Sequence, residues 1–454
     1  MSSPLLPDSA PTYAEAERAL LARWPETRLE PSLDRIAAFT ELLGEPQRTY
    51  PVLHLTGTNG KTSTSRMIDT LLRATDLRTG RFTSPHVESM TERISLDGEP
   101  VSEERFLQAY NEVAAIARLV DEDSPHPLSF FEMVVGMAFA TFADAPVDAA
   151  VVEVGMGGSW DATNVADAAV SVLLPIALDH SAYLGSRPVD IAREKAGIIK
   201  PGSRVVCAQQ ADDVAGVIAE RAAEVGAAVL TEGRDFGVDR RVPAVGGQML
   251  RLQGLHAAYD DVFLPLYGAH QAQNAAVALA AVEAFFGEDA LDADLVRTAF
   301  EEATSPGRLE VIRRSPAILL DVAHNPHGAA AVVDALGDSF ALDPLVGVVG
   351  VMADKDYEGV LAAFEPAMAA IVCTQNTTPR ALRAEDLAEV ARGIFGFDRV
   401  YVEPRLDDAI ERAATLAEQG GVFGEAIGSG GVLVTGSVVT VGEARGMLKR
   451  RERL

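Results

Sequence analysis

Short apolar runs alternate with longer stretches of helical periodicity along most of the chain. Each run in the first half is apolar at nearly every position rather than at every second one; the runs are 50–55, 149–154, 170–174 and 204–206. Helical periodicity fills 103–119, 130–142 and 212–225. Strands that are buried on both faces and alternate with helices are typical of a parallel sheet in an α/β fold.

The pattern changes between residues 233 and 267, where short segments such as 248–252 alternate in polarity. This favours a small antiparallel piece added to the sheet. Helical periodicity then returns, and the segment from Thr304 to Arg308, with Pro306 and Gly307, breaks it. A second series of apolar runs follows at 317–320, 345–349, 370–372 and 431–435. We therefore expect two α/β domains, over 1–304 and 305–454.

Composition narrows the classes of function. The 454 residues include 39 Lys and Arg against 66 Asp and Glu, a formal net charge of −27. This balance argues against binding to nucleic acid or to an anionic membrane surface, since both need a basic face. The longest apolar run, 133–143, is too short to span a membrane, and no signal peptide opens the chain. We expect a cytoplasmic enzyme in which Cys207 and Cys373 are small buried residues.

A glycine-rich turn, Gly57 to Thr62, lies between the first apolar run and a helical pattern. The backbone N–H groups of such a turn, with the N-terminus of the next helix, bind phosphates. Lys61 is expected to reach the β- and γ-phosphates and Thr62 to face Mg²⁺. Leu55 stands where the usual motif has a further glycine, so the pattern is a shortened GxxGK[ST]. The alternative is an ordinary turn before a helix.

The segment from Thr56 to Thr62 resembles the phosphate loop of the Mur-type ATP-dependent amide ligases. Further segments narrow the resemblance to the folylpolyglutamate synthase/dihydrofolate synthase branch: TSPH at 83–86, EVGMGG at 153–158, DATN at 161–164, ALDH at 177–180, EKAGI at 194–198, PGR at 306–308 and DVAHNP at 321–326. The resemblance implies an N-terminal P-loop ATP-binding domain with a mainly parallel sheet. It also implies a C-terminal Rossmann-like domain that binds glutamate.

The resemblance further implies a reaction. This family ligates L-glutamate to a carboxylate, here expected to be dihydropteroate, a folylpolyglutamate or both. ATP converts the carboxylate into an acyl phosphate, and the glutamate amine then displaces phosphate. Because several anions meet in such a site, a cation clamp is needed, and two Mg²⁺ ions with oxygen ligands suit it. A monovalent cation is a further candidate. The expected partners are small molecules only, and the expected state is a monomer.

The implied metal ligands are Ser84, Glu153, His180 and Lys195, and the implied catalytic residues are Lys61, His180 and Lys195. Glu153 is the only charge in its run, and a carboxylate at the end of a parallel strand faces the ligand crevice of the sheet. Lys195 binds a metal only as the carbamate that the family's lysine forms, which requires a neutral amine. Each residue has an alternative role. Ser84 could be an ordinary turn residue and Glu153 a solvated carboxylate. His180 could be structural, and Lys195 could form a salt bridge.

For the nucleotide, the implied residues are Gly57, Thr58, Asn59, Gly60, Lys61, Thr62, Asn274, Arg308 and Asp321. Asn274 is expected near the adenine, with a helix cap as its alternative role. His324 is a candidate for a glutamate or phosphate contact. Near the pterin, the implied residues are Phe131, Trp160, Asp161 and Ala162. An aromatic ring there can stack on the flat substrate, although Phe131 also fits an aromatic core position.

Two positions depart from the family's pattern. Thr62 stands where the family often has glycine or serine. Ser159 stands where arginine is usual, which leaves open how the acceptor is held. Two rival functions were considered. A peptidoglycan-precursor ligase usually carries a separate N-terminal nucleotide-sugar domain, for which the chain before the phosphate loop leaves no room. A P-loop ATPase or GTPase switch would carry a guanine-reading NKxD motif, which does not occur in the sequence. We therefore predict an ATP-dependent glutamate ligase.

Overall fold

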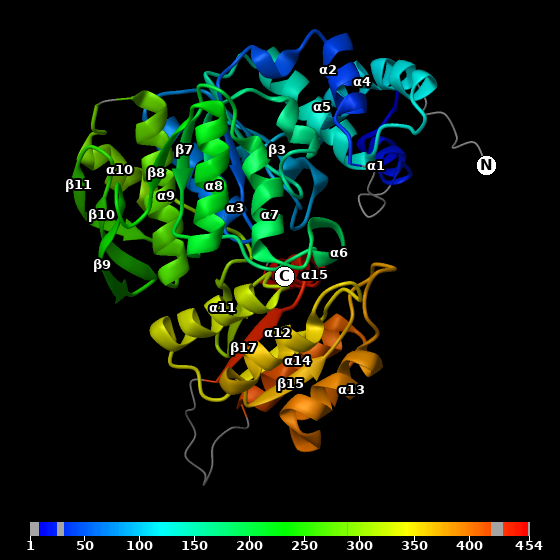
Figure 1. Ribbon diagram of the computed structural model, residues 1–454. Helices are drawn as coiled ribbons and strands as arrows, with labels where there is room; N and C mark the ends of the chain where they lie inside the picture. The colour runs from blue at the N-terminus through cyan, green and yellow to red at the C-terminus, as the bar shows by residue number, and fades with distance from the viewer. Residues whose placement is uncertain (1–8, 25–30, 288, 419–429, 453–454) are drawn as a thin grey trace. The chain divides into compact units, whose positions relative to one another are not determined.

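The computed structural model describes residues 9–24, 31–287, 289–418 and 430–452. The chain forms two compact units. The first comprises the residues up to 240 with 250–263 and 272–303, and the second comprises 241–249, 264–271 and the residues from 304 onward. Each unit contains a mainly parallel sheet flanked by helices (Figure 1).

The sheet of the first unit runs in the order β4-β3-β2-β5-β1-β6-β7-β8. Its strands pair in parallel from β2 to β8, whereas β3 and β4 are antiparallel at one edge. The strands are β1 Val52–Thr56, β2 Thr79–Phe82, β3 Ile94–Leu96, β4 Glu99–Pro100, β5 Ala149–Glu153, β6 Ala168–Leu173, β7 Arg204–Cys207 and β8 Ala228–Thr231.

Strand β1 lies in the middle of this sheet, between β5 and β6. Every residue of β1 and of β5 is buried, which explains why most of their residues are apolar. Leu55 pairs with Glu153 and Thr56 pairs with Leu173, so the carboxyl ends of the three strands lie side by side. The loops that follow them meet at one edge of the sheet, where open α/β sheets bind ligands.

The helices associated with this sheet vary in length from one turn to 21 residues. Helices α4 and α5 share a hydrophobic core with Val52 of β1 and Val152 of β5, and α3 packs on β1, β2 and β5. The helices are α1 Tyr13–Leu21, α2 Asp34–Leu42, α3 Lys61–Ala74, α4 Glu103–Asp123, α5 Phe130–Asp144, α6 Ser181–Leu184, α7 Pro188–Lys195, α8 Asp212–Val225, α9 Ala269–Phe286 and α10 Ala293–Glu301.

A small separate sheet occupies the region where the polarity pattern changes. Its strands, in the order β11-β10-β9, are β9 Gly237–Ala244, β10 Gly247–Gln253 and β11 Ala258–Leu264. This is the small antiparallel sheet predicted from the alternating segments.

The sheet of the second unit runs in the order β12-β13-β17-β14-β15-β16, with β12 antiparallel and the others parallel. Its strands are β12 Glu310–Arg314, β13 Ala317–Leu320, β14 Leu345–Val349, β15 Ala370–Cys373, β16 Val400–Val402 and β17 Gly431–Thr435. Its helices are α11 Pro326–Ser339, α12 Tyr357–Phe364, α13 Ala384–Phe395, α14 Leu406–Glu418 and α15 Val438–Glu452.

Both faces of this second sheet are covered by helices (Figure 1). Leu319 of β13 packs in a core with α11, α12 and α13, whereas its neighbours Ile318 and Leu320 pack in another core with α14 and α15. Alternate side chains therefore enter different cores, which is why the strand has no polar positions.

The fold also bears on the two cysteines and on the question of a membrane-spanning helix. Cys207 and Cys373 are buried, unpaired cysteines, as predicted. Within the part of the chain that the structure describes, no helix is long and apolar enough to cross a membrane.

Candidate active site

The phosphate loop lies between β1 and α3 and is shaped by close approaches to two glycines. A Cβ atom on Gly57 would lie 2.6 Å from the Cβ of Leu174, and one on Gly60 would lie 2.6 Å from Oδ1 of Asn274. Gly60 also has a φ of +88°, in the left-handed region that favours glycine. The loop therefore needs glycine at both positions, and the Asn274 side chain lies directly against it.

Hydrogen bonds from Thr58 attach the phosphate loop to the segment that follows β6. The Thr58 backbone N–H donates to the Pro175 carbonyl at 3.0 Å, and the Thr58 hydroxyl donates to the Ala177 carbonyl at 2.9 Å. The Ala177 N–H returns a hydrogen bond to the Thr58 hydroxyl at 3.0 Å. The phosphate loop and the chain leading to His180 are thus fixed to one another.

Two lysines converge on one carbonyl of this loop. Lys195 donates from Nζ to the Gly57 carbonyl at 2.9 Å, and Lys61 donates to the same oxygen at 3.0 Å. Burial, followed by the positive charge of Lys61, lowers the pKa of Lys195 from 10.5 to about 7, against the opposing charges of Asp179, Asp161 and Glu194. A substantial fraction of Lys195 is therefore a neutral amine near neutral pH.

A carboxylate and a hydroxyl meet at the start of α3. Glu153 ends β5 and is only 1% exposed, and the Thr62 hydroxyl, which donates to this carboxylate, lies 3.0 Å from each of its oxygens. Ser84 follows β2, the strand on the other side of β5, so Ser84 and Glu153 leave the same edge of the sheet. These are hard oxygen donors of the kind that Mg²⁺ prefers.

The remaining predicted metal ligand, His180, lies at the start of the short helix α6. Its backbone is left-handed, with a φ of +51°, and its Nε2 lies 3.9 Å from Oδ2 of Asp179. Among the described residues, no group of three or more His, Cys, Asp or Glu side chains forms a metal cluster. The predicted ligands would not form such a cluster, because two of them are Ser84 and Lys195, the lysine as a carbamate.

The predicted acceptor residues gather around the loop from Gly155 to Trp160. A Cβ on Gly155 would lie 2.5 Å from the ring of Phe131, and one on Gly157 would lie 3.1 Å from the ring of Trp160. Asp161 accepts hydrogen bonds from the loop N–H groups, including that of Met156 at 2.9 Å. Its burial raises the pKa of Asp161 to about 6, although the hydrogen bond from Thr163 and those from the backbone oppose the shift. Ala162, which is buried, follows directly.

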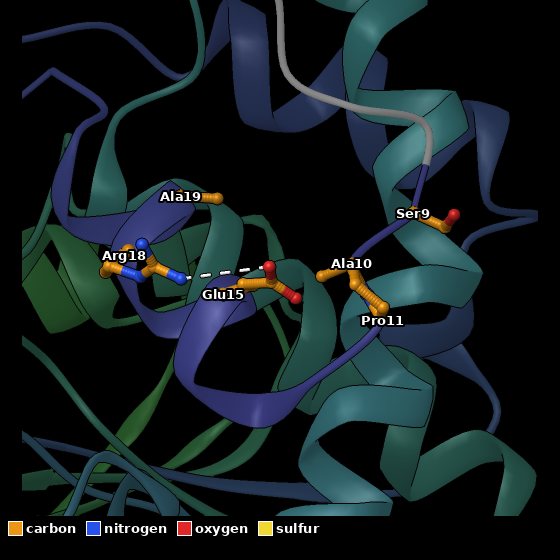
Figure 2. A pocket seen from close by; sticks show the side chains of 6 residues that line it. All are labelled: Ser9, Ala10, Pro11, Glu15, Arg18 and Ala19. Atoms are coloured by element: carbon orange, nitrogen blue, oxygen red, sulfur yellow. Dashed lines mark ion pairs between the residues drawn. The ribbon is translucent and has the colours of Figure 1, made fainter.

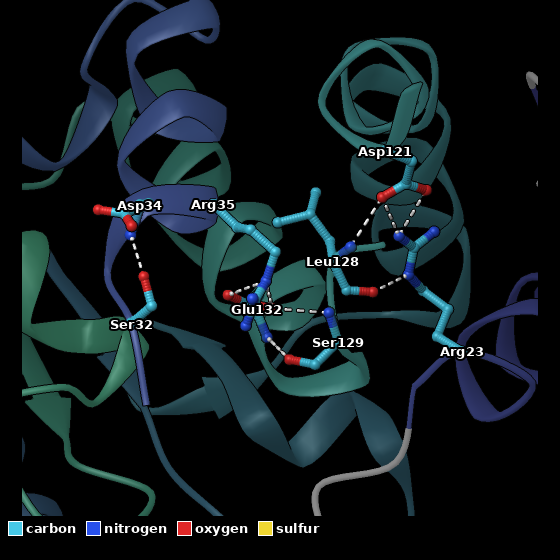
Figure 3. A network of polar contacts seen from close by, with 8 residues as sticks. All are labelled: Arg23, Ser32, Asp34, Arg35, Asp121, Leu128, Ser129 and Glu132. Carbon is cyan, nitrogen blue, oxygen red and sulfur yellow. Dashed lines mark hydrogen bonds and ion pairs between the residues drawn. The ribbon is translucent and has the colours of Figure 1, made fainter. Parts of the chain in front are cut away.

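A network of polar contacts lies at the start of α5, the helix to which Phe131 belongs (Figure 3). Ser129 and Glu132 form a capping box, and Arg35 of α2 donates to Glu132 at 3.1 Å. Arg23 binds Asp121 at 2.7 Å and also donates to the carbonyl of Leu128, just before the cap. Arg23 and Glu132 are buried, and the network connects the start of α5 to α2 and to α4.

Three further predicted residues lie in the second unit. Asp321 follows β13 and accepts from the backbone N–H groups of Ala323 at 2.8 Å and Leu309 at 2.9 Å. Burial raises the pKa of Asp321, and the charge of Arg308 opposes this shift. The ring of His324 contacts the Val322 carbonyl through Nδ1 at 3.0 Å.

A shallow hollow of about 430 Å³ lies elsewhere, beside α1 (Figure 2). Its lining residues are Ser9, Ala10, Pro11, Glu15, Arg18 and Ala19. None of them is a predicted site residue, and the predicted residues of the first unit lie around the carboxyl edge of its sheet instead.

Comparison with known proteins places the chain in a family. Residues 55–282 match the Mur ligase middle domain, and residues 307–438 match the glutamate ligase domain of Mur ligases. The chain is 48% identical to the dihydrofolate synthase/folylpolyglutamate synthase of Mycobacterium tuberculosis, over 98% of this chain and 95% of that protein. The chain belongs to the dihydrofolate synthase/folylpolyglutamate synthase family of Mur ligases.

Solved structures of family members agree. Mycobacterium tuberculosis folylpolyglutamate synthase complexed with ADP and AMPPCP matches with a TM-score of 0.92 and 48% identity, covering 96% of this chain and 98% of that one. Escherichia coli FolC in complex with DHPP and ADP matches with a TM-score of 0.86 and 28% identity, covering 98% and 100%. The predicted family and its α/β architecture are thereby confirmed.

The residue where this chain departs from the family has a clear role in the structure. The Ser159 hydroxyl donates to Oε2 of Glu194 at 2.5 Å, and Oε1 of Glu194 accepts from the N–H groups of Gly158 at 3.2 Å and Trp160 at 3.4 Å. Glu194 thus holds the loop from Gly155 to Trp160, whereas its neighbour Lys195 contacts the phosphate loop. Ser159 completes a clamp that the sequence did not reveal.

The structure thus brings together most of the predicted residues of the first unit, while their individual roles stay predictions. Sequence reasoning missed Glu194, Thr163 and Arg35. Glu194 and Thr163 stand within the EKAGI and DATN segments, which was a usable signal. Arg35 stands in an ordinary helical pattern, and only its buried contact with Glu132 distinguishes it.

Proposed function

We propose that the residues around Gly57 carry out the ATP-dependent ligation of L-glutamate to a pteroate or folate acceptor. Dihydrofolate synthase/folylpolyglutamate synthase activity is that of the family to which the chain belongs. The single observation that supports this assignment is the contact of Lys195 Nζ with the Gly57 carbonyl, because it places an amine of lowered pKa against the phosphate loop.

Phosphate binding falls to the loop backbone, the N-terminus of α3 and Lys61. An oxygen of the acceptor carboxylate attacks the γ-phosphorus of ATP, the bond to the bridging oxygen breaks, and ADP leaves. The nitrogen of L-glutamate then attacks the acyl carbon, loses a proton and expels phosphate. Lys61 counters the negative charge that develops in the first step, because its ammonium lies within the loop.

The metal ligands follow from the same arrangement. When bound, Mg²⁺ neutralises phosphate oxygens and orients them. Thr62 and Glu153 offer oxygens at the start of α3, and Ser84, His180 and a carbamate on Lys195 are the other proposed ligands. The carbamate forms when the neutral amine of Lys195 attacks the carbon of CO₂ and releases one proton, which leaves an anionic oxygen donor.

Acceptor binding is assigned to the loop that Glu194 holds. The ring of Phe131 and that of Trp160 offer faces on which a pterin can stack, and Asp161, followed by Ala162, offers a carboxylate to the ring N–H groups. For the nucleotide, Asn274 in the first unit and Arg308 and Asp321 in the second are proposed contacts. His324 is proposed for glutamate or phosphate. A cytoplasmic monomer remains our prediction, which gel filtration and cell fractionation test.

The deciding experiment measures ADP release and the mass of the product with L-glutamate and either dihydropteroate or tetrahydrofolate. We expect ADP and a product one glutamate heavier, and no such product when L-glutamate is omitted. Lys61→Ala should abolish turnover in a folded protein. Arg18→Ala, which removes an exposed positive charge on α1, should not. Glutamate-independent ATP hydrolysis, or ligation to a peptidoglycan precursor alone, would contradict the proposal.

A further inference from the structure

A single imidazole lies inside the central strand of the first unit. His54 is the third residue of β1 and is completely buried. Side chains alternate along a strand, so His54 shares a face with Val52, which belongs to the hydrophobic core around α4 and α5. A polar ring in such surroundings needs a hydrogen-bond partner.

That partner connects β1 to the acceptor loop. His54 Nε2 lies 2.8 Å from the Thr163 hydroxyl, which in turn donates to Oδ1 of Asp161. The Thr163 N–H also donates to Oδ1 at 3.0 Å, and the Met156 N–H donates to Oδ2 at 2.9 Å. Two residues along the same face of β1, the Thr56 hydroxyl donates to the Gly157 carbonyl at 2.9 Å.

When Asp161 is ionised, only one direction is open to each hydrogen bond in this chain. A hydroxyl has one proton, and that of Thr163 is donated to the carboxylate of Asp161. His54 must therefore carry its proton on Nε2 and donate it to Thr163. Among the described residues, Nδ1 of His54 has no hydrogen-bond partner, which agrees with an unprotonated nitrogen there. Burial lowers the pKa of His54 to about 3, with a smaller contribution from Lys200, so the ring is neutral.

We propose that His54 is a positioning residue for the acceptor site: its Nε2–H, through the Thr163 hydroxyl, holds Asp161 in one orientation as an ionised carboxylate. This inference rests on the proposed function, in which Asp161 accepts hydrogen bonds from the acceptor ring. A proton on Oδ1 of Asp161 would reverse the chain and place a hydrogen on Nδ1 of His54. That hydrogen would be buried without an acceptor, which is costly.

A loss of this lock should weaken acceptor binding more than ATP binding. Without the proton donated by His54, the Thr163 hydroxyl is no longer committed to donating to Asp161, so the carboxylate would be freer to rotate or to take up a proton. The phosphate loop is held separately, by Thr58 and by the packing of Gly57 on Leu174. A general loosening of β1 would instead affect both ligands, since the loop begins directly after this strand.

Kinetics and binding test the proposal with a matched control. His54→Leu should raise both the Kd and the KM for dihydropteroate about tenfold, as one lost hydrogen bond predicts, and leave the KM for ATP nearly unchanged. His54→Gln, whose amide can donate from the position of Nε2, should recover most of the affinity. Ser171→Ala is the control. Ser171 lies on β6 beside His54 of β1 and is equally buried. Its hydroxyl bonds to Ser203 and to the Ile198 carbonyl, not to Thr163.

The same logic applies at Thr163. Thr163→Ser keeps the hydroxyl and should behave as the wild type, whereas Thr163→Val should weaken acceptor binding. Unchanged dihydropteroate affinity in folded His54→Leu, or equal losses for ATP and acceptor, would overturn the proposal. If the His54 and Thr163→Val variants do not fold, the tautomer decides: in ¹⁵N spectra of the histidine-labelled wild type, the ring of His54, assigned through its backbone resonances, should be neutral and protonated on Nε2 only.

A His54 ring protonated on Nδ1, or on both nitrogens, would refute the lock. Thr163→Ser, which should keep that signal in place, serves as the check on its assignment. The proposed function fails separately: a wild-type protein that binds no pterin in calorimetry would remove the acceptor assignment itself. A wild-type protein that binds pterin, with affinity independent of His54, would remove only this inference.

Discussion

Lys61 and Lys195 donate to the same carbonyl oxygen, that of Gly57, although they are 134 residues apart in the sequence. Two ammonium groups so close together repel each other, and Lys195 is the more deeply buried of the two. This repulsion disappears when Lys195 loses its proton. In the proposed function, the charge of Lys61 would thus favour the neutral form of Lys195 that reacts with CO₂.

The first prediction concerns pH. Since the pKa of Lys195 is about 7, its neutral fraction falls about tenfold for each pH unit below that value. Activity in bicarbonate buffer should therefore rise as the pH increases from 6 to 8, and ¹³C-bicarbonate should give a carbamate signal that follows the same curve. Lys195→Arg should show neither signal nor activity, and full activity in that variant would rule the carbamate out.

The lowered pKa of Lys195 also predicts that the free energy of unfolding depends on pH. The pKa of Lys195 is lower in the folded protein than its usual value of 10.5, so between pH 7 and 10.5 the unfolded chain binds the extra proton. The contribution of Lys195 to the free energy of unfolding should therefore increase with pH across that window. Urea denaturation of wild type and Lys195→Met at pH 7 and pH 9 measures it.

A second prediction separates the two lysines. Lys61→Met removes the nearby positive charge, so the pKa of Lys195 should rise and the ¹³C carbamate signal should appear at higher pH than in the wild type. This readout does not require turnover, which the substitution should abolish. Arg18→Met, on the exposed side of α1, is the control. An unchanged carbamate titration would mean that burial alone sets the pKa of Lys195.

A third prediction concerns Gly60. In Gly60→Ala the new methyl group would lie 2.6 Å from Oδ1 of Asn274, and the alanine backbone would have to keep a left-handed φ. The loop must therefore move. The KM for ATP should rise strongly, with a smaller effect on dihydropteroate binding. Gly216→Ala, in helix α8 with open space around it, should instead stabilise the protein by about 1 kcal/mol in urea denaturation. Normal ATP affinity in Gly60→Ala would show that the loop tolerates displacement.

The fourth prediction concerns the clamp on the acceptor loop. Ser159→Ala removes one hydrogen bond to Glu194 and should lower the free energy of unfolding by about 1 kcal/mol. Glu194→Ala leaves the donors of Gly158, Ser159 and Trp160 unsatisfied and should cost more. It should also raise the KM for dihydropteroate. Equal effects of the two substitutions would mean that Glu194 does not hold the loop.

Local patterns were enough to predict much of this protein. The run 317–320 forms β13 with the bounds that its apolar residues indicate, because each residue enters a core on one face or the other. The phosphate loop was equally visible, since glycines, a lysine and a hydroxyl at fixed spacing express local backbone geometry. Such features depend on neighbours in the sequence, and hydrophobic burial and turn sterics act at that range.

Other features depend on residues that meet only in the folded chain. Strand β2 contains Arg81, which a pattern of polarity places in solvent, yet it is 2% exposed and pairs with Asp69 at 2.7 Å. The same holds for His54, whose partner Thr163 lies 109 residues away. The protonation of Lys195 likewise depends on its burial and on Lys61. A buried charge or ring is stable only with its partner in place, so these assignments required the tertiary structure.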